Sequence, residues 1–399
     1  MNDARRVIFV NRVYWPASAA TAQLLTDLAE GLAVGGWEVH VIATGEGVAT
    51  RNGVTIHRTG AGARHGGLLS RALNYRRFAR AAAAKLGGLA RAGDIVVPMT
   101  DPPLLGAAVA EAVADRGVRV VPWIQDIYPE IAAAHFGFLA SLALAPLKAR
   151  RDAAWLSAAT CVPLGEDMAR LVSEQGVARG RIAVLPNWAP RELHMPAPDA
   201  EIEAHRRRWG LADKFIVAYS GNLGRVHEFA TILDAAALIR DDPRIVLLFI
   251  GSGARFDTVA AAVRGRQLAN VRLLPPEPRS GLTTSLRAAD AHFVTLLPAY
   301  SRLVYPSKLA GVLAAARPVL FIGPPDGEIA RLVREHDCGS AVAPGEAKAL
   351  AARIRQLAAD RALREAQGRK SRALYEQRFT GDAALAGWDR LLRGLPRAI

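Results

Sequence analysis

Short apolar runs alternate with amphipathic helical segments along almost the whole chain, and this alternation constrains the fold more than any other feature. Residues 6–11 (RVIFVN) have the length and apolarity of a buried strand. Residues 21–34 carry leucines at helical spacing, and residues 38–44 (EVHVIAT) form the next strand-like run. Strands that alternate with helices predict a parallel sheet covered by helices on both faces.

The alternation occurs twice, with a proline-rich break between the two halves. Further strands are predicted in the first half at residues 54–58, 95–99, 118–124, 160–164 and 182–185. In the second half they are predicted at residues 215–220, 245–250, 271–274, 291–296 and 318–322, with terminal helices at residues 346–379 and 382–392. Pro190, Pro196 and Pro198 interrupt residues 188–198, which we interpret as a linker.

The predicted fold class is therefore α/β, with two Rossmann-like, doubly wound parallel-sheet domains. A length of 399 residues also exceeds the usual size of a single core. We expect an N-terminal domain over residues 1–190, a C-terminal domain over residues 191–378, and a helix over residues 379–399 that packs back on the N-terminal domain. Two such domains leave a cleft between the carboxyl ends of their sheets, where these folds bind ligands.

Charge and cysteine content narrow the class of partner and the compartment. The formal net charge of +14 favours acidic partners such as nucleotide phosphates or anionic lipid headgroups. Nucleic acid is not expected, because the chain has no basic tail, zinc-ligand spacing or ribonucleoprotein-type motif. Only Cys161 and Cys338 are present, far apart in sequence, which indicates a reducing compartment. We predict a cytoplasmic protein without a transmembrane helix.

The predicted strand at residues 215–220 leads into a glycine-containing loop that ends in Arg225. A strand, a glycine loop and a following helix present backbone N–H groups and a helix N-terminus to an anionic phosphate. Parallel αβ units also need glycines at this turn for backbone reasons alone. The loop by itself therefore leaves both interpretations open.

Six short motifs resemble, in order and spacing, those of glycosyltransferase family 4, whose members have the GT-B fold. They are residues 14–16 (YWP), 123–130 (WIQDIYPE), 185–188 (LPNW), 219–224 (YSGNLG), 305–309 (YPSKL) and 327–330 (GEIA). The chain looks most like bacterial sugar transferases of colanic-acid and O-antigen assembly, including fucosamine transferases. Each motif has low specificity, but their shared order covers nearly the whole chain.

The resemblance implies a metal-independent glycosyltransferase that retains anomeric configuration and needs no cofactor. The donor would be a nucleotide sugar, with a UDP-sugar favoured and a GDP-sugar as the alternative. The acceptor would be a polyprenyl-diphosphate-linked or other saccharide. The product would enter the assembly of O-antigen, capsule or exopolysaccharide. The enzyme would be a hexosyltransferase or an acetylaminosugar transferase. The absence of any Asp-x-Asp triplet or His/Cys cluster agrees with a reaction that needs no metal.

The sequence departs from the family at positions that usually carry charge. The family commonly has two glutamates on the donor side, and the matching positions here are Leu303 and Gly311. The usual Arg and Lys of the glycine loop correspond to Asn222 and His227, although Arg225 offers a cation nearby. These departures put the contacts to the sugar hydroxyls in doubt.

Candidate donor-side residues fall in three stretches of the second half, at residues 220–227, 307–308 and 328. Arg225 and Lys308 are the candidates for neutralising the leaving diphosphate, since that step develops negative charge. Glu328 would accept hydrogen bonds from the ribose hydroxyls, as an acidic residue does in dinucleotide sites. The alternatives are a surface lysine for Lys308 and a favourable helix-dipole charge for Glu328. The further donor-binding candidates are Ser220, Gly221, Asn222, Gly224, His227 and Ser307.

The first half is expected to bind the acceptor. Asp126 follows an apolar strand, at a carboxyl end where a catalytic carboxylate can reach the ligand. Tyr14, Ser18, Thr21 and Glu130 are the other acceptor-side candidates. Helix capping by Asp126 and a first-turn charge at Glu130 are the structural alternatives. In a retaining reaction the leaving phosphate can itself take the acceptor proton.

A basic segment in the first half predicts contact with an anionic membrane surface. Residues 59–93 contain no acidic residue, and their arginines include Arg71, Arg76, Arg77 and Arg80, interspersed with leucines and aromatics. A solvated helix face is the alternative. The uncharged residues 136–147, followed by Lys148, could form a second contact. We therefore expect peripheral binding to the inner face of the cell membrane.

Two alternative functions remain open at the level of the sequence. The missing glutamates favour a non-catalytic GT-B subunit that binds a nucleotide sugar or a partner enzyme. A sugar-nucleotide epimerase of the same fold would need no acceptor.

Overall fold

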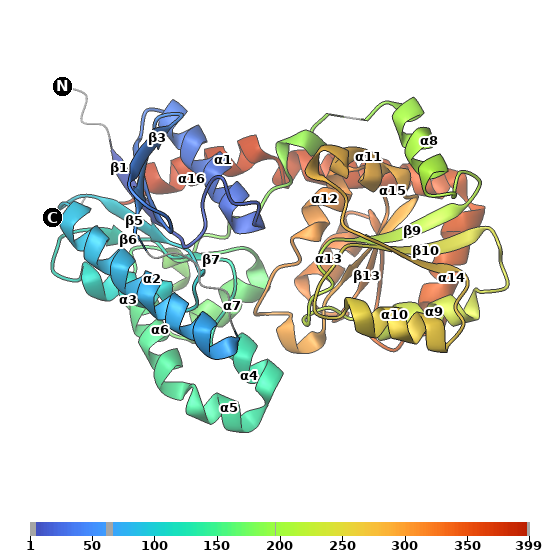
Figure 1. The fold of residues 1–399 in the computed structure, drawn as a ribbon, viewed down its shortest axis with the longest axis horizontal. Helices are drawn as coiled ribbons and strands as arrows, with labels where there is room; N and C mark the ends of the chain where they lie inside the picture. Colours follow the sequence, from blue (N-terminus) through green and yellow to red (C-terminus); the bar gives the residue numbers. More distant parts are fainter. Residues whose placement is uncertain (1–4, 61–66, 196, 397–399) are drawn as a thin grey trace. The chain divides into compact units, whose positions relative to one another are not determined.

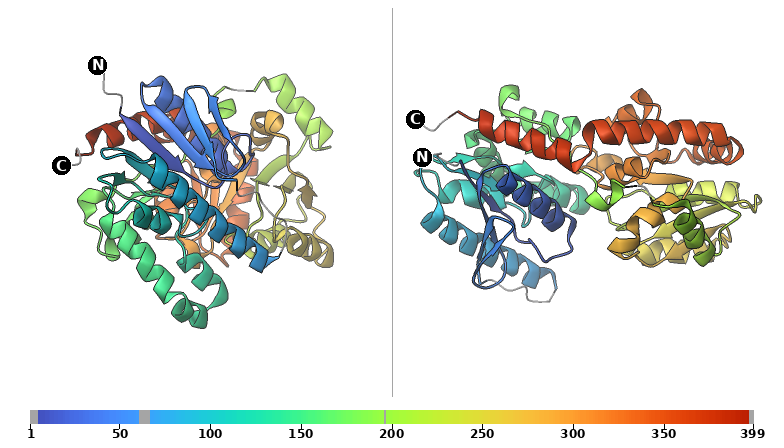
Figure 2. Two further views of the ribbon diagram at one scale, coloured as in Figure 1. Left: turned by 60° about the vertical axis from the view of Figure 1, so that its left-hand side comes forward. Right: turned by 90° about the horizontal axis from the view of Figure 1, so that it is seen from above.

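The computed structural model describes residues 5–60, 67–195 and 197–396, which divide into two compact units. Unit 1 comprises Met1–Pro186, Arg302–Tyr305 and Gly381–Ile399. Unit 2 comprises Asn187–Ser301 and Pro306–Thr380. Each unit is a helix-covered sheet (Figures 1 and 2).

Unit 1 contains a six-stranded sheet in the order β3-β4-β2-β1-β5-β6. The strands are β1 (Arg6–Val10), β2 (Glu38–Ala43), β3 (Val48–Arg51), β4 (Val54–Arg58), β5 (Ile95–Pro98) and β6 (Arg119–Val120). All neighbouring pairs are parallel except β3 and β4. The antiparallel edge strand β3 was not predicted, because its largely exposed sequence VATR lacks the apolar run of a buried strand.

Helices cover both faces of this sheet. The α-helices described in unit 1 are α1 (Ala20–Val34), α2 (Leu68–Leu89), α3 (Leu105–Ala112), α4 (Glu130–Phe136), α5 (Phe138–Ala143), α6 (Ala145–Ser157), α7 (Glu166–Glu174) and α16 (Gly381–Gly394). Of these, α4 and α5 bury no side chain and are not part of the covering layers. On one face, Phe78 of α2 and Val109 of α3 pack against Ile8 of the central strand. Trp388 of α16 meets Trp123 edge to face, with ring centroids 5.0 Å apart. The C-terminal helix is thus part of unit 1.

The strand predicted over residues 118–124 is wrong as a single element. It divides into β6 in the main sheet and β7 (Trp123–Ile124), which pairs with β8 (Val162–Pro163) in a separate two-stranded sheet. Pro122 lies between them, and proline cannot donate a ladder hydrogen bond. The predicted strand at residues 182–185 is also absent, since only a bridge between Cys161 and Ile182 forms there.

Unit 2 contains a fully parallel six-stranded sheet in the order β11-β10-β9-β12-β13-β14. The strands are β9 (Phe215–Ser220), β10 (Ile245–Ile250), β11 (Val271–Leu274), β12 (Ala291–Thr295), β13 (Val319–Ile322) and β14 (Gly339–Val342). Five of these were predicted. The sequence GSAV of β14 lacks large apolar side chains and gave no strand signal.

The two faces of the unit 2 sheet bury alternate residues of the same strands. Val217 and Phe249 face α9 (Ala230–Leu238), α10 (Phe256–Gly265) and α14 (Ala347–Ala359). Ile216 and Leu248 belong to the core cluster on the opposite face. The remaining helices are α8 (Asp199–Arg208), α11 (Leu282–Ala288), α12 (Lys308–Ala314), α13 (Glu328–Glu335) and α15 (Arg361–Arg378).

The single helix predicted over residues 346–379 is two helices, α14 and α15. Asp360 separates them and caps the second helix, because its side-chain oxygen accepts a hydrogen bond from the Leu363 N–H at 2.9 Å. Helical periodicity continues through this position, so the break is visible only as the N-cap residue type.

Each sheet has a point where the strand order reverses beside its central strand. In unit 1 the chain passes from β1 to β2 and returns to β5 on the other side of β1. In unit 2 it passes from β9 to β10 and returns to β12 on the other side of β9. Ligands bind at the carboxyl ends of the strands at such points. The loops after β1, β5, β9 and β12 are therefore the places to look for function.

Among the described helices, none is both long enough and apolar enough to span a bilayer.

Candidate functional sites in the two units

The loop after β9 in unit 2 lies against the end of β10. The Gly221 N–H donates to the Ile250 carbonyl at 2.8 Å, and the Leu223 N–H donates to the Ser252 carbonyl at 2.7 Å. Two glycines after β10 allow this approach. A Cβ at Gly251 would lie 2.0 Å from the Gly221 oxygen, and one at Gly253 would lie 2.2 Å from Asn222 Oδ1. These glycines were not predicted as site residues, although a Gly-Ser-Gly sequence directly after a buried strand is a usable signal.

Lys308 reaches this loop from the first turn of α12. Its Nζ lies 3.2 Å from His227 Nε2 and 5.0 Å from the centroid of the Tyr219 ring. A Cβ at Gly221 would lie only 2.8 Å from Lys308 Cε, and Gly221 has a φ of +127°. Glycine at this position therefore permits both the backbone conformation and the close approach of the lysine.

His227 is held in one orientation beneath the lysine. Its side chain is 7% exposed, and its Nδ1 lies 2.8 Å from the Thr295 carbonyl at the end of β12. A carbonyl can only accept, so Nδ1 carries the proton and Nε2 accepts from the Lys308 ammonium. Burial, with the nearby Lys308 charge, lowers the pKa of His227 to about 4. The imidazole is therefore neutral at physiological pH and serves as an acceptor.

The electrostatics of this cluster favour an anionic ligand. Burial lowers the pKa of Lys308 to about 8, so the ammonium is still mostly charged near neutral pH. A partly desolvated cation gains more from an anionic partner than an exposed one, because water screens it less. Lysine also has three N–H donors, of which one points to His227. Lys308 and the glycine loop together suit a phosphate group.

The other predicted donor-side residues lie at or after the carboxyl ends of β9, β12 and β13 in the same sheet. Asn222 and Arg225 are exposed on the glycine loop, and Ser307 is exposed at the start of α12. Glu328 opens α13, after β13. Ser220 ends β9. A Cβ at Gly224 would lie 3.2 Å from Asn222 Nδ2 and 3.6 Å from His227 Cδ2.

The two positions where the family carries glutamates are apolar in their surroundings. Leu303 is buried, and its carbonyl accepts a hydrogen bond from the Ile127 N–H within unit 1. A Cβ at Gly311 would lie 3.6 Å from Leu193 and Leu286 side chains. A glutamate at Gly311 would therefore start among leucines of unit 2.

In unit 1 an ion pair spans the point where the strand order reverses. Arg12 follows β1, and Asp101 follows β5. The Arg12 guanidinium binds the Asp101 carboxylate through two hydrogen bonds of 2.9 Å. Sequence reasoning missed both residues. Arg12 comes directly after one predicted strand and Asp101 two residues after another, and those positions are the signal that could have found them.

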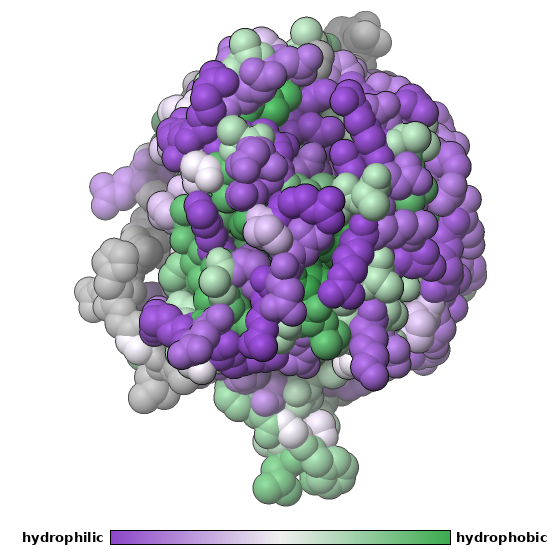
Figure 3. Space-filling view, turned by 90° about the vertical axis from the view of Figure 1, so that its right-hand side faces the viewer, coloured by the Kyte–Doolittle hydropathy of each residue, from purple (hydrophilic) through white to green (hydrophobic). Residues whose placement is uncertain are grey.

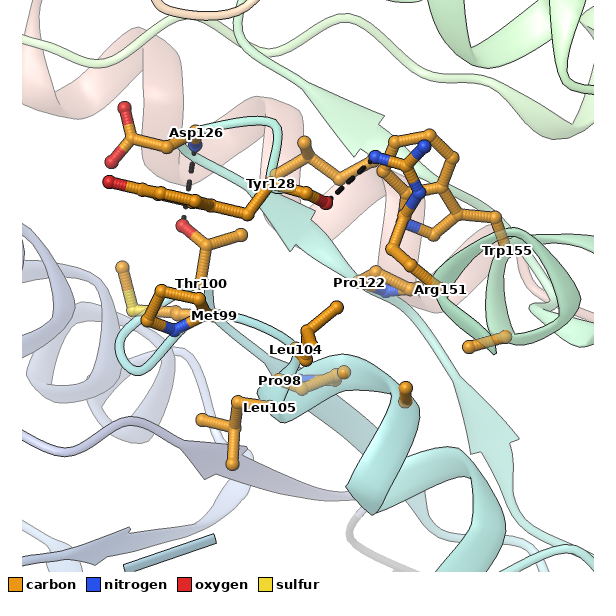
Figure 4. A pocket seen from close by; sticks show the side chains of 15 residues that line it. Pro98, Met99, Thr100, Leu104, Leu105, Pro122, Asp126, Tyr128, Arg151 and Trp155 are labelled. Atoms are coloured by element: carbon orange, nitrogen blue, oxygen red, sulfur yellow. Dashed lines mark hydrogen bonds between the residues drawn. The ribbon is translucent and has the colours of Figure 1, made fainter. Parts of the chain in front are cut away.

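Asp126 lies beside this pair, where its backbone N–H meets Thr100 Oγ1 at 3.3 Å (Figure 4). Burial, and secondly the Asp101 charge, raise the pKa of Asp126 from 3.8 to about 6. Asp126 lines a small cavity of about 30 Å³ together with Thr100, Leu104 and Tyr128. Its carboxyl group can thus change protonation state near neutral pH, as a group that handles substrate hydroxyls often does.

The other acceptor-side candidates differ in how far they are buried and in what they contact. Tyr14 is buried in the core, and burial raises the pKa of its hydroxyl, so it offers little surface to a ligand. Ser18 is exposed and Thr21 partly exposed at the start of α1. Glu130 forms two hydrogen bonds, of 2.9 and 2.6 Å, with buried Arg151. The Glu130 carboxylate therefore ties the first turn of α4 to Arg151 of α6, which fits the structural alternative of a first-turn charge.

The basic residues predicted to contact a membrane lie on α2. Arg76, Arg77 and Arg80 are exposed. The Arg71 side chain lies outside the described residues. Within the described parts of the chain, no group of three His, Cys, Asp or Glu side chains is placed to hold a metal ion.

Comparison with protein families gives two matches that follow one another along the chain. Residues 20–188 match the family described as glycosyl transferase 4-like domain, and residues 201–374 match glycosyl transferases group 1. Among curated proteins, a probable glycosyltransferase, WbjE of Pseudomonas aeruginosa, is 29% identical over 73% of this chain and 72% of its own. The putative colanic acid biosynthesis glycosyl transferase WcaI of Escherichia coli K12 is 28% identical over 48% of each chain.

Solved structures match nearly the whole chain. Sucrose-phosphate synthase from Thermosynechococcus elongatus superposes with a TM-score of 0.79 and 19% identity, over 98% of this chain and 99% of that one. HepE of Anabaena in complex with UDP gives a TM-score of 0.74 and 15% identity, over 98% and 100% of the two chains. At these identities the matches establish the fold.

Replacing Asp126 by Asn should stabilise the protein at neutral pH. The pKa of Asp126 is raised in the folded state from 3.8 to about 6. Between pH 3.8 and about pH 6 the folded protein therefore binds more protons than the unfolded chain does. Stability is therefore lost as pH rises through this range. Asp126→Asn should raise the free energy of unfolding by about 1–3 kcal/mol near pH 7.5, with a smaller gain toward pH 4. Urea unfolding of both proteins measures this difference.

The matched control is Asp115→Asn, which changes an exposed carboxylate of the same unit. An equal effect of the two substitutions, or a gain at Asp126 that does not vary with pH, would contradict the raised pKa.

Proposed function

The chain belongs to the group 1 glycosyltransferases of family 4 and has the GT-B fold, and we propose that it transfers a sugar from a nucleotide-diphosphate donor to a lipid-linked saccharide. We favour a UDP-sugar as the donor. HepE, which shares the fold, has been solved with UDP and with UDP-glucose. The names of WbjE and WcaI support a role in bacterial polysaccharide assembly, and WcaI is assigned to colanic acid.

The contact between Lys308 and the glycine loop is the observation that carries this proposal. Cleavage of the sugar–phosphate bond places negative charge on the leaving diphosphate. A pre-positioned cation stabilises that charge more than it stabilises the bound donor. The Lys308 side chain lies against the loop backbone, and Gly221 leaves room for it. Arg225 would add a second charge from the exposed side of the loop.

The other donor contacts follow from the positions of the loops. We assign the diphosphate to the loop from Ser220 to Gly224 and to Ser307. Glu328, the first residue of α13, would accept hydrogen bonds from the ribose hydroxyls. This assignment leaves no part for a metal ion, because Lys308 and Arg225 neutralise the diphosphate.

Asp126 is proposed to handle an acceptor or sugar hydroxyl in unit 1. With a pKa of about 6 its carboxyl group is mostly ionised at neutral pH and accepts a hydrogen bond from a hydroxyl. The Arg12–Asp101 pair fixes the loop beside it. In a retaining reaction the leaving phosphate takes the acceptor proton, so Asp126 would orient the hydroxyl without having to remove its proton.

The acceptor is proposed to be lipid-linked and the protein to act at the cytoplasmic face of the membrane. The exposed Arg76, Arg77 and Arg80 of α2 support this location, since clustered arginines bind anionic headgroups.

Replacing Lys308 by Met should remove transfer while the protein stays folded. Loss of one charge-stabilising donor costs about 10²–10³-fold in turnover. The assay is release of UDP from a panel of UDP-sugars with lipid-linked saccharide acceptors. Lys348→Met, at an exposed position on α14, is the matched control and should keep full activity.

The same assay separates the alternatives. Activity of Lys308→Met equal to that of the wild type would remove the diphosphate site. Wild-type binding of nucleotide sugars without turnover on any acceptor would favour a non-catalytic subunit, and interconversion of donor sugars without an acceptor would indicate an epimerase.

Affinity for UDP should fall as pH rises above about 8, the pKa of Lys308 in the free protein. A deprotonated Lys308 carries no charge, so apparent affinity should drop by up to about tenfold per pH unit above this value. Calorimetric titration between about pH 7 and about pH 9.5 measures how the affinity for UDP depends on pH. Lys308→Met should bind UDP more weakly, and its affinity should not fall over this pH range. The same slope in both proteins would show that another group titrates.

A further inference from the structure

Helices α4 and α5 form a hairpin that contributes nothing to the core of unit 1. Gly137 joins them with a φ of +87°, a conformation that glycine adopts readily. Neither helix contains a buried side chain. Helices of seven and six residues are too short to be stable alone in water, because most helical stability comes from packing an apolar face. The hairpin therefore has an apolar face without a partner inside unit 1.

The side chains on this hairpin are large and apolar. Phe136, Phe138, Leu139 and Leu142 are 67%, 75%, 79% and 58% exposed. The α5 label marks this hairpin at the lower edge of Figure 1, and in Figure 3 the surface at the same height is a mostly green projection. Residues 131–147 contain no Asp, Glu, Lys or Arg. Scattered apolar residues on a surface are ordinary, whereas a contiguous group of this size marks a contact site.

The surface next to the hairpin is basic. A groove of about 790 Å³ lies between α2, α3 and α6 and is lined by Arg76, Arg80, Leu147 and Arg150. Leu147 and Arg150 follow the hairpin directly on α6. Arg150 is held by Glu111, whereas Arg76 and Arg80 lie exposed on α2, in a stretch without acidic residues. An apolar tip bordered by arginines is the arrangement of an interfacial membrane anchor.

We propose that the α4–α5 hairpin inserts its apolar side chains into the headgroup layer of an anionic bilayer, with the α2 arginines at the phosphates. This inference rests on the proposed function only in that a lipid-linked acceptor would be found there. Insertion removes the four large side chains from water. The arginines then exchange water for lipid phosphate, which they bind well.

Charge favours a bilayer over a second copy of the chain. A two-fold dimer places the same patch on both sides of the interface. Residues 59–93 and 131–147 contain no acidic residue, so such a dimer would bring arginine against arginine. The net charge of +14 adds to this repulsion. An anionic bilayer supplies both the apolar layer and the opposite charge.

Flotation with vesicles tests the hairpin directly. The wild-type chain should float with vesicles of about 30% phosphatidylglycerol in phosphatidylcholine and float less with pure phosphatidylcholine. Phe138→Ser combined with Leu139→Ser should reduce the bound fraction by about tenfold or more. The matched control combines Val34→Ser and Val48→Ser, two exposed apolar residues elsewhere in unit 1, and should bind as the wild type does.

A reporter variant tests the depth of insertion. Leu139→Trp should show tryptophan emission that shifts to shorter wavelength on vesicles and is quenched by brominated lipid beyond the wild-type signal. The proposal is overturned if the serine variant floats like the wild type, if Leu139→Trp gains no quenching, or if the wild-type chain binds neutral and anionic vesicles equally. It is also overturned if the wild-type chain is a dimer that the Phe138→Ser, Leu139→Ser variant dissociates and the control variant does not.

Transfer to a water-soluble acceptor separates this inference from the proposed function. The hairpin serines should leave that activity unchanged while flotation is lost. Loss of flotation with unchanged soluble activity supports the anchor, and flotation by a chain without any transferase activity would refute the proposed function alone.

Discussion

The close approach of the Lys308 side chain to the Gly221 backbone is the contact on which the unit 2 site depends. A Cβ at position 221 would lie only 2.8 Å from Lys308 Cε, so the lysine side chain would have to move. Gly251 and Gly253 allow the same loop to lie on the end of β10. His227, fixed by the Thr295 carbonyl, accepts from the ammonium and defines its position. Three glycines and one neutral histidine thus hold a cation where the strand order reverses.

The candidate site of unit 1 lies at the equivalent point of its own sheet, where the strand order reverses. Its candidate ligand-binding group, the Asp126 carboxyl, has the opposite charge to Lys308 when ionised. The Arg12–Asp101 pair joins the loops after β1 and β5, and Asp126 lies beside it with a raised pKa. The Lys308 cation in one unit suits an anionic group, and the Asp126 carboxylate in the other suits a hydroxyl. The same fold therefore supplies two different chemistries through the residues that follow its strands.

Most of the sheet could be predicted from the sequence, because parallel strands buried on both faces are continuous apolar runs. The predictions failed where this rule does not apply: Pro122 divides one run into β6 and β7, and β3 and β14 are short edge strands without large apolar residues. Motifs also gave Lys308, His227 and Asp126 as candidate site residues, which remain predictions. Their contacts could not be predicted, since Lys308 and His227 lie 81 residues apart. The Arg12–Asp101 pair was missed because it requires knowing that β1 and β5 are neighbours.

A crystal structure of the wild-type chain with a bound UDP-sugar is the most direct test of the diphosphate site. We expect a phosphate oxygen about 2.7–2.9 Å from Lys308 Nζ, the length of a charge-assisted hydrogen bond, with the loop from Ser220 to Gly224 against the same diphosphate. A diphosphate bound away from this loop, with Lys308 still bonded to His227 alone, would contradict the assignment.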